Sequence, residues 1–358
     1  MTIPNLLSRC RDGATIMTSK KMDPVAKKVA RNLQHKGVPI EYTRDCVIDI
    51  DVFSDGELCT TIRPNVRDKV VFLFWDFTPD DFVGHINIRM RELEVALSAL
   101  RYSSVREVVL IMPYYPYSRQ ERPMKRQPVS AKDFAETLEK FGIVSHLVTF
   151  DLHVPQIALF FSKIKVINIP GHVIFAPFFR KKFAAQIQKG TLQILATDVG
   201  GSKRARDCAE KTDPGLEIAI IDKRRGKDGS KAMKIVGDVS DTMIAYDDIG
   251  GTMGTLLDGL YLAFKEGAKE GYGAIAHNVC SPKLVKGDEE GVLTTAEAKI
   301  AAAKIPIFTL DTLPRGKQYY KDNPLITRVP YEKFMAGLIL EIMSVDGSIG
   351  RLTEEWVC

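Results

Sequence analysis

The ten residues from Tyr246 to Thr255, YDDIGGTMGT, carry the clearest potential for chemistry in this sequence. Two adjacent acids, Asp247 and Asp248, follow an apolar run and precede a turn rich in glycine and threonine. Carboxylates accept hydrogen bonds from neighbouring hydroxyls, and backbone N–H groups before a helix bind phosphate. A plain helix N-cap would not need the acid pair, so we expect a sugar-phosphate site. Its predicted phosphate-binding residues are Gly251, Thr252, Met253, Gly254 and Thr255.

Two common nucleotide-binding motifs are missing from the sequence. Neither the P-loop pattern GxxxxGK[ST] nor the dinucleotide pattern GxGxxG occurs in it. The polar turn at 246–255 therefore belongs to neither of these two folds.

Four other apolar, β-rich runs are also followed by polar segments. In parallel α/β sheets, ligands bind beyond the carboxyl ends of the strands, so these segments are candidate binding loops. They are PYYPYSRQER after the run 108–112, DLH after 146–150, TDVGGSKRAR after 192–196 and DKRR after 218–221.

Strand-like and helix-like segments alternate along the chain, which predicts an α/β fold with largely parallel sheets. A Pro-Gly turn at 170–171 indicates a domain boundary there, which gives domains 1–170 and 171–358. The expected strands are 70–75, 108–112, 146–150, 166–169, 192–196, 218–221, 243–246 and 274–276. The expected helices are 24–34, 87–100, 131–140, 173–189, 203–211 and 255–266.

The composition is that of a folded globular protein. The chain has 358 residues and 40.0 kDa, enough for two domains, with 27% charged and 45% hydrophobic residues. The net charge of +5 is small and the two signs are mixed, so no nucleic-acid partner is expected. Basic clusters at 119–126, 203–206 and 223–227 suit a polyanionic small molecule or a solvated helix face.

Cysteine usage and hydropathy indicate the compartment. Six cysteines without a CxxC pair disfavour a zinc site and a disulfide framework, which favours a reducing environment. No apolar run of about 18 residues occurs, so no membrane association is expected. We therefore expect a cytoplasmic protein.

Together these loops resemble a known family. The segment at 246–255 resembles the phosphoribosyl-binding loop of type I phosphoribosyltransferase-fold proteins, and within them that of the ribose-phosphate pyrophosphokinases, or PRPP synthetases. The resemblance runs from about residue 12 to residue 350. Its landmarks recur in the family's order: FSDGE at 53–57, PYSRQER at 116–122, DLH at 151–153, DVGG at 198–201, IDKRR at 221–225 and GDV at 237–239.

The resemblance implies a fold and a reaction. The fold would contain two phosphoribosyltransferase-like domains, each with a largely parallel sheet flanked by helices. The N-terminal domain would supply the ATP side and the oligomer contacts, and the C-terminal domain the ribose 5-phosphate loop and a catalytic flexible loop. The reaction would move the β,γ-diphosphate of ATP onto ribose 5-phosphate, giving PRPP and AMP.

The resemblance also implies roles for single residues. Phe53, Asp55 and Glu57 would contribute to the adenine pocket of a neighbouring subunit, and Arg119 and Gln120 would contact ATP. His153 would approach the metal–phosphate group, and Asp198 would bind metal and ribose. Two regulatory positions near a phosphate or ADP site are implied only by the family, at Arg67 and Arg126.

The reaction needs cations and exact placement more than covalent chemistry from the protein. Lys223 and Arg225 lie two apart on a predicted extended loop, so both can point to one side and clamp the phosphates of ATP. The polar segment 226–231 is expected to act as a closing lid. Mg²⁺ is the expected metal, because carboxylates, phosphates and waters suit a hard octahedral cation. A homo-oligomer, tetramer or hexamer, and activation by phosphate are further implications of the family.

The sequence departs from the family at three places. The family pattern DDxxDTxGT has a third acid where this chain has Gly251. The family's HGxFSGPA becomes HNVCSPK at 277–283, and a polar insertion follows at 287–297. These differences leave a catalytically silent regulatory subunit open as an alternative. A phosphoribosyltransferase, which consumes PRPP, is the other alternative, although it would not need the FSDGE, RQ and DKRR elements.

Overall fold

The computed structural model describes residues 13–78, 85–225, 231–281, 283–284, 293–344 and 346–357. The chain divides into two compact units, one of Met1–Pro170 with Tyr331–Glu354 and one of Gly171–Pro330 with Glu355–Cys358. The predicted C-terminal domain of 171–358 was therefore wrong in its last part, because residues 331–354 return to the first unit.

Helix packing explains this return. Helix α10 (Glu332–Met343) buries most of its length, including Phe334 and Leu338, and it packs on α1 (Asp23–His35). Helix α1 offers a matching apolar stripe at Val25, Val29 and Leu33. An ion pair of 3.0 Å between Lys28 Nζ and the buried Glu332 Oε1 joins the two helices.

The first unit contains a seven-stranded parallel sheet. Its order is β2-β1-β6-β7-β8-β9, with β3 beside β1. The central strands are buried along their whole length, as expected for a sheet covered on both faces. The bounds are β1 Ala14–Ser19, β2 Ile40–Glu41, β3 Val47–Ile48, β6 Val70–Phe74, β7 Glu107–Ile111, β8 Val144–Phe150 and β9 Lys165–Ile169.

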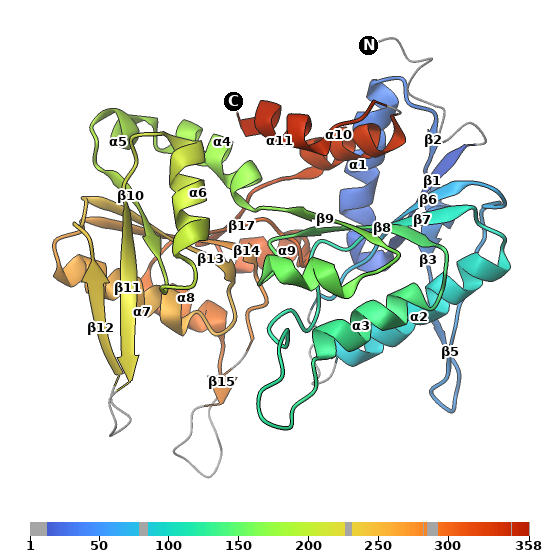
Figure 1. Ribbon diagram of the computed structural model, residues 1–358, viewed down its shortest axis with the longest axis horizontal. Coiled ribbons are helices and arrows are strands. Elements are labelled where there is room, and N and C mark those ends of the chain that lie inside the picture. Colours follow the sequence, from blue (N-terminus) through green and yellow to red (C-terminus); the bar gives the residue numbers. More distant parts are fainter. Residues whose placement is uncertain are drawn as a thin grey trace. The chain divides into compact units, whose positions relative to one another are not determined.

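Helices flank this sheet on both faces. In Figure 1, α1 and α10 lie on one side of it, and α2 (His85–Tyr102) and α3 (Ser130–Glu139) lie on the other. A small antiparallel hairpin of β4 (Asp51–Val52) and β5 (Leu58–Cys59) stands apart from the main sheet. The remaining helices of the unit are the 3₁₀ helices η2 Lys20–Met22, η3 Arg44–Cys46 and η4 Pro155–Phe160; α11 (Ile349–Val357) ends the described chain.

The second unit has its own seven-stranded sheet, in the order β12-β11-β10-β13-β14-β17-β18. All neighbouring pairs in it are parallel except β11 with the edge strand β12, which is antiparallel. The bounds are β10 Leu192–Ala196, β11 Ile218–Arg225, β12 Lys231–Val236, β13 Thr242–Ile249, β14 Glu270–His277, β17 Ile307–Thr309 and β18 Ile326–Arg328; β15 Lys283–Leu284 pairs with β16 Leu293–Thr294 outside the sheet.

Alternate residues of the central strands face two different helix layers. Leu195 and Ala245 belong to a core built with α7 (Gly254–Lys265) and α8 (Ala296–Ala303). On the opposite face, the ring of Tyr246 packs edge-on against Phe175 of α4 (His172–Lys182), beside α6 (Ser202–Thr212). Figure 1 shows α4 and α6 together over this sheet. The other helices are α5 Ala184–Gln188 and α9 Gly316–Asp322.

The predicted fold class is confirmed: both units are α/β with largely parallel sheets flanked by helices. All eight expected strands and all six expected helical segments are present, with shifted ends. One local prediction was wrong. Lys223 and Arg225 lie on strand β11 rather than on a loop, because β12 pairs with β11 up to Arg225 opposite Lys231. Most of the predicted lid, residues 226–230, lies outside the described residues.

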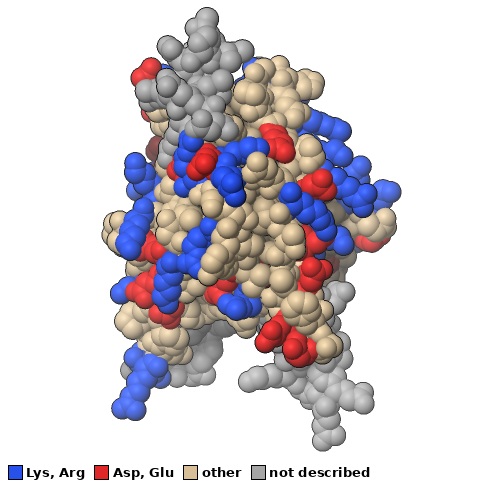
Figure 2. Space-filling model, turned by 90° about the vertical axis from the view of Figure 1, so that its right-hand side faces the viewer, with Lys and Arg blue, Asp and Glu red and all other residues tan. Residues whose placement is uncertain are grey.

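Charged side chains of both signs are mixed over the surface drawn in Figure 2, as the sequence predicted. Within the described part of the chain, no helix combines the length and apolarity needed to cross a membrane. All four cysteines that the structure describes are free thiols: Cys46, Cys59, Cys208 and Cys280.

Candidate active site

The acid pair ends the central strand of the second unit. Strand β13 extends to Ile249, so Asp247 and Asp248 lie within the strand, directly before its last residue, and the turn begins after them. Strands β10 and β14 flank β13 as parallel neighbours, so the carboxyl ends of three strands meet here. This is the place where a parallel sheet binds ligands.

Two side chains from neighbouring elements hold the pair. The Thr197 hydroxyl, just after β10, donates to Asp247 Oδ2 at 2.6 Å. The Arg204 guanidinium, on α6, donates through Nη1 to Asp248 Oδ1 at 3.1 Å and lies 3.7 Å from Asp247 Oδ1. Sequence reasoning missed the individual roles of Thr197 and Arg204, although both lie in the predicted binding loop TDVGGSKRAR.

Burial, and next to it the adjacent Asp248 carboxylate, together raise the pKa of the Asp247 carboxyl to about 7. The Thr197 hydroxyl and the positive charge of Arg204 act in the opposite direction. Asp247 is therefore an acid that changes its charge near neutral pH, in a position to accept a hydrogen bond from a substrate hydroxyl when ionised.

The predicted phosphate turn opens helix α7. Met253 has the left-handed backbone conformation, with φ of 60°, and precedes the first helical residue, Gly254. No side chain caps this helix start, and the first turn of a helix has N–H groups without intrahelical partners. Such groups bind phosphate. The Met253 side chain itself is buried in the core, so only its backbone can serve a ligand.

Packing leaves Gly250 no room for a side chain. A Cβ atom there would come within 2.4 Å of both Ile275 Cδ1 and Met253 Cε. Gly251, where the family has its third acid, is held through its carbonyl by the Ser281 N–H at 3.1 Å. The glycines thus let the turn pack directly on β14 and on the segment after it.

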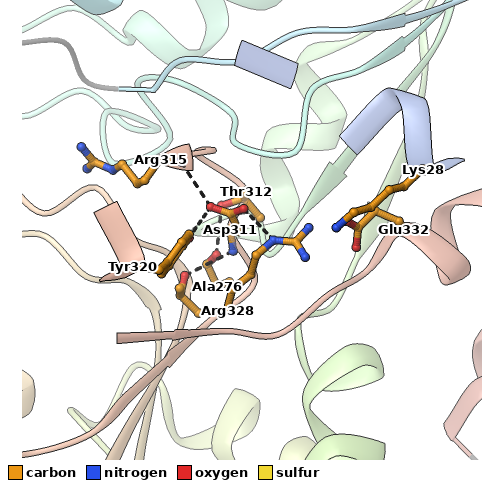
Figure 3. Close-up of polar contacts among 9 residues, drawn as sticks. Lys28, Ala276, Asp311, Thr312, Arg315, Tyr320, Arg328 and Glu332 are labelled. Carbon is orange, nitrogen blue, oxygen red and sulfur yellow. Dashed lines mark hydrogen bonds and ion pairs between the residues drawn. The ribbon is translucent and has the colours of Figure 1, made fainter. Parts of the chain in front are cut away.

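A buried polar cluster fixes that following segment. Arg315 Nη2 donates to the carbonyls of Asn278 and Val279 at 3.0 and 2.6 Å. Figure 3 shows Asp311, just after β17, receiving hydrogen bonds from Arg328 and Tyr320 and from the Arg315 backbone. The cluster ties the end of β17 to the segment that borders the phosphate turn.

A lysine also reaches the turn. Lys299 of α8 donates from Nζ to the Thr252 carbonyl at 3.1 Å, which places an ammonium group beside the predicted phosphate site. Sequence reasoning missed this residue, because it lies more than forty positions away from the turn and no local pattern marks it.

Of the predicted metal ligands, Asp198 is exposed and accepts the Gly201 N–H at 2.8 Å through Oδ1. No group of three or more His, Cys, Asp or Glu side chains that could hold a metal ion exists among the residues that the structure describes. Carboxylate oxygens such as those of Asp198 are of the type that suits Mg²⁺, which prefers oxygen ligands and keeps several waters.

Lys223 is an exposed side chain on β11. Arg225 is the last residue of the same strand. Its side chain lies outside the described part of the structure, so the shared side predicted for the two cations stays a prediction.

The first unit contains a pocket of about 450 Å³ at the carboxyl ends of its strands. The segment after β7 supplies Arg119, Gln120, Glu121 and Arg122, and the loop after β8 supplies His153. The Gln120 carbonyl accepts the Ala131 N–H at 3.3 Å, which anchors the segment to the start of α3. The structure thus brings together two of the five predicted ATP residues, Arg119 and Gln120, and the predicted catalytic histidine.

The hairpin β4–β5 carries the other predicted ATP residues. Phe53 is 53% exposed at its tip, and the Asp55 carboxylate accepts the Glu57 N–H at 3.1 Å. None of these three residues lines the pocket beside His153. Arg67 and Arg126, the implied regulatory positions, are both exposed.

Two parallel sheets with polar strand ends, one of them with an acid pair and a glycine-rich phosphate-type turn, define the class of phosphate-binding α/β proteins. Comparisons with known proteins give the family. Residues 14–142 match the model of the N-terminal domain of ribose phosphate pyrophosphokinase. Ribose-phosphate pyrophosphokinases from Fusobacterium nucleatum and Cereibacter sphaeroides are 36% and 33% identical, over 68% and 75% of this chain and 75% and 77% of their own lengths.

The fold is also similar to that of a solved structure. A phosphoribosylpyrophosphate synthetase from Mycobacterium smegmatis superposes with a TM-score of 0.75, covering 92% of this chain and 98% of that protein at 23% identity. The chain belongs to the ribose-phosphate pyrophosphokinase family, as the sequence predicted.

Proposed function

We propose that this protein transfers the β,γ-diphosphoryl group of ATP to the 1-hydroxyl of ribose 5-phosphate, giving PRPP and AMP. The observation that carries the proposal is the acid pair at the end of β13, followed directly by the uncapped start of α7. A ribose 5-phosphate needs both halves, one for its hydroxyls and one for its phosphate. The curated relatives, named for this activity, support the same conclusion.

In this proposal the ribose lies with its hydroxyls at Asp247 and Asp248. The carboxylates accept hydrogen bonds from them and so orient the attacking oxygen, which provides much of the catalytic effect in phosphoryl transfer. The 5-phosphate binds the backbone N–H groups of residues 251–255, and the Lys299 ammonium, 3.1 Å from the Thr252 carbonyl, adds positive charge. Because Gly251 replaces an acid, this turn also carries one negative charge fewer than the family pattern.

The nucleotide side of the proposal uses the pocket of the first unit. Arg119 and Gln120 contact ATP, and His153 approaches its phosphates. Lys223 and Arg225 stabilise the negative charge that develops as the diphosphoryl group moves. Mg²⁺, when bound, neutralises the phosphates of ATP, with His153 and Asp198 as its proposed protein contacts.

We further propose a homo-oligomer, tetramer or hexamer, in the cytoplasm, activated by phosphate near Arg67 and Arg126. The exposed apolar tip of the β4–β5 hairpin, with Val52 66% and Phe53 53% exposed, supports its contact with a neighbouring subunit. The free thiols support a reducing compartment.

The test is to incubate the pure protein with ATP, Mg²⁺, phosphate and ribose 5-phosphate and to follow AMP and PRPP. The wild type should form both products in equal amounts, and Lys223→Ala should lower kcat on the order of a hundredfold or more with ATP binding retained. A wild type that binds the substrates without forming AMP would instead identify the silent regulatory subunit that Gly251 leaves open.

A further inference from the structure

Helix α6 directs one cation of its basic segment to the acid pair and leaves the others in solvent. Lys203 and Arg206 are exposed, whereas the Arg204 side chain is only 19% exposed. Its Nη1 lies 3.1 Å from Asp248 Oδ1 and 3.7 Å from Asp247 Oδ1. The segment predicted as a basic cluster therefore contains one residue with a separate role.

Two neighbouring carboxylates repel each other, and burial makes that repulsion stronger. Asp247 is anchored by the Thr197 hydroxyl and by the Asp248 N–H at 2.9 Å, both of which fix its orientation without neutralising charge. The charged groups that face Asp247 are Asp248, on the same strand, and Arg204, from α6. Arg204 thus provides the positive charge that partly offsets this repulsion and favours the ionised form of Asp247.

We propose that Arg204 is a positioning residue for sugar binding, which offsets the negative charge of the acid pair and holds Asp247 and Asp248 oriented to accept hydrogen bonds from the ribose hydroxyls. This inference rests on the proposed function of the acid pair. Arg204 does not touch the substrate in this account; it acts through the carboxylates. The effect of losing it should therefore appear in ribose 5-phosphate binding and should spare ATP.

The variant Arg204→Gln tests the proposal, and Arg204→Lys restores the charge. Arg180→Gln is the matched control, because Arg180 donates to the Thr212 and Lys211 carbonyls at the opposite end of the same helix. The Arg180→Gln variant removes these contacts at the C-terminal end of α6 and leaves the contacts of Asp247 and Asp248 unchanged. We expect Arg204→Gln to raise the KM for ribose 5-phosphate on the order of tenfold or more, since a charge-assisted contact is removed. The KM for ATP should stay unchanged, Arg204→Lys should recover part of the loss, and Arg180→Gln should match the wild type in KM.

The pH profile separates positioning from plain structural support. Without Arg204 the pKa of Asp247 should rise, so the KM of Arg204→Gln should fall to its minimum at a higher pH than that of the wild type. The substrate phosphate also titrates, with a second pKa near 6, but it does so identically for both proteins. Equal KM values and pH profiles in Arg204→Gln and wild type, or equal losses in Arg204→Gln and Arg180→Gln, would overturn the proposal.

A titration without substrate keeps this inference separate from the proposed function. Carboxyl ¹³C NMR should show the Asp247 pKa higher in Arg204→Gln than in the wild type and partly restored in Arg204→Lys. If the wild type forms no PRPP while this shift is present, the reaction assignment fails and the charge-holding role of Arg204 stands. If the shift is absent, the role of Arg204 fails, whatever the activity.

Discussion

In the second unit, the acids near the ends of strands β13 and β17 differ in their surroundings. Asp311, after β17, accepts hydrogen bonds from the Arg328 Nε at 2.7 Å, from the Tyr320 hydroxyl and from the Arg315 N–H. Asp247 and Asp248, at the end of β13, stand side by side and share Arg204. Burial raises the pKa of both Asp311 and Asp247; the groups around Asp311 act against that rise, whereas at Asp247 the neighbouring Asp248 carboxylate adds to it.

This difference separates a structural acid from a functional one. A buried carboxylate that is surrounded by donors has a single function, which is to hold those donors in place. Two adjacent carboxylates with one shared cation are an unfavourable arrangement for stability alone, and such arrangements are typical of binding sites.

The largest expected effect tests the structural role of Asp311. Asp311→Ala removes the buried carboxylate that accepts hydrogen bonds from Arg328, Tyr320 and the Arg315 N–H, which should lower the free energy of unfolding by about 3–5 kcal/mol. Urea unfolding followed by circular dichroism measures this change. At low temperature the folded variant should keep the wild-type KM for ribose 5-phosphate. Unchanged stability would show that Asp311 is not the centre of the cluster in Figure 3.

The second largest effect tests the functional role of the acid pair. Asp248→Asn keeps the shape of the side chain but removes its charge, so kcat/KM for ribose 5-phosphate should fall on the order of a hundredfold. The melting temperature should change little, because removal of one of two repelling charges offsets the loss of the Arg204 contact. A large drop in melting temperature with intact kinetics would show that Asp248 has a structural role and not a role in substrate binding.

The pH dependence sharpens the comparison. The pKa of Asp247 is raised to about 7, so its carboxylate form is present above that pH and lost below it. The KM for ribose 5-phosphate should therefore rise about tenfold between pH 8 and pH 6 in the wild type. Asp247→Asn has no such group to titrate, so its remaining pH dependence should be that of the substrate phosphate. Identical profiles for the two proteins would remove Asp247 from the binding step.

The smallest expected effect concerns Lys299. Lys299→Met removes a charge beside the phosphate turn while preserving the length of the side chain, so the KM for ribose 5-phosphate should rise by roughly threefold to tenfold. Affinity for free ribose, which has no phosphate, should stay unchanged. Lys304→Met, at the C-cap position directly after α8, serves as a matched control. An equal change in both variants would contradict a direct effect on the phosphate site.

Local sequence signals predicted the fold class and the turn at 246–255, because a buried strand, a glycine turn and a helix each leave their own pattern. They could not predict which side chains surround the acids. Arg204 reaches Asp248 only through the rotation of α6 on the sheet, and Lys299 reaches Thr252 from another helix. The return of α10 to the first unit also depends on a partner, α1, some three hundred residues away.

The hairpin of β11 and β12 was missed for a different reason. The parts of its strands next to the turn, DKRR at 222–225 and KAMK at 231–234, are rich in charged residues, so their composition resembles that of a loop. The pairing places Lys223 opposite Met233 and gives the proposed catalytic cation a defined strand position.

The central claim is that the acid pair and the turn after it bind ribose 5-phosphate for diphosphoryl transfer. The most direct measurement is ³¹P NMR of the wild type with ATP, Mg²⁺ and ribose 5-phosphate, with Asp248→Asn and folded Asp311→Ala in parallel. The account predicts a new sugar diphosphate and AMP in equal amounts from the wild type and Asp311→Ala, and a strongly slowed reaction in Asp248→Asn. No sugar diphosphate from the wild type, or an unaffected Asp248→Asn, would contradict it.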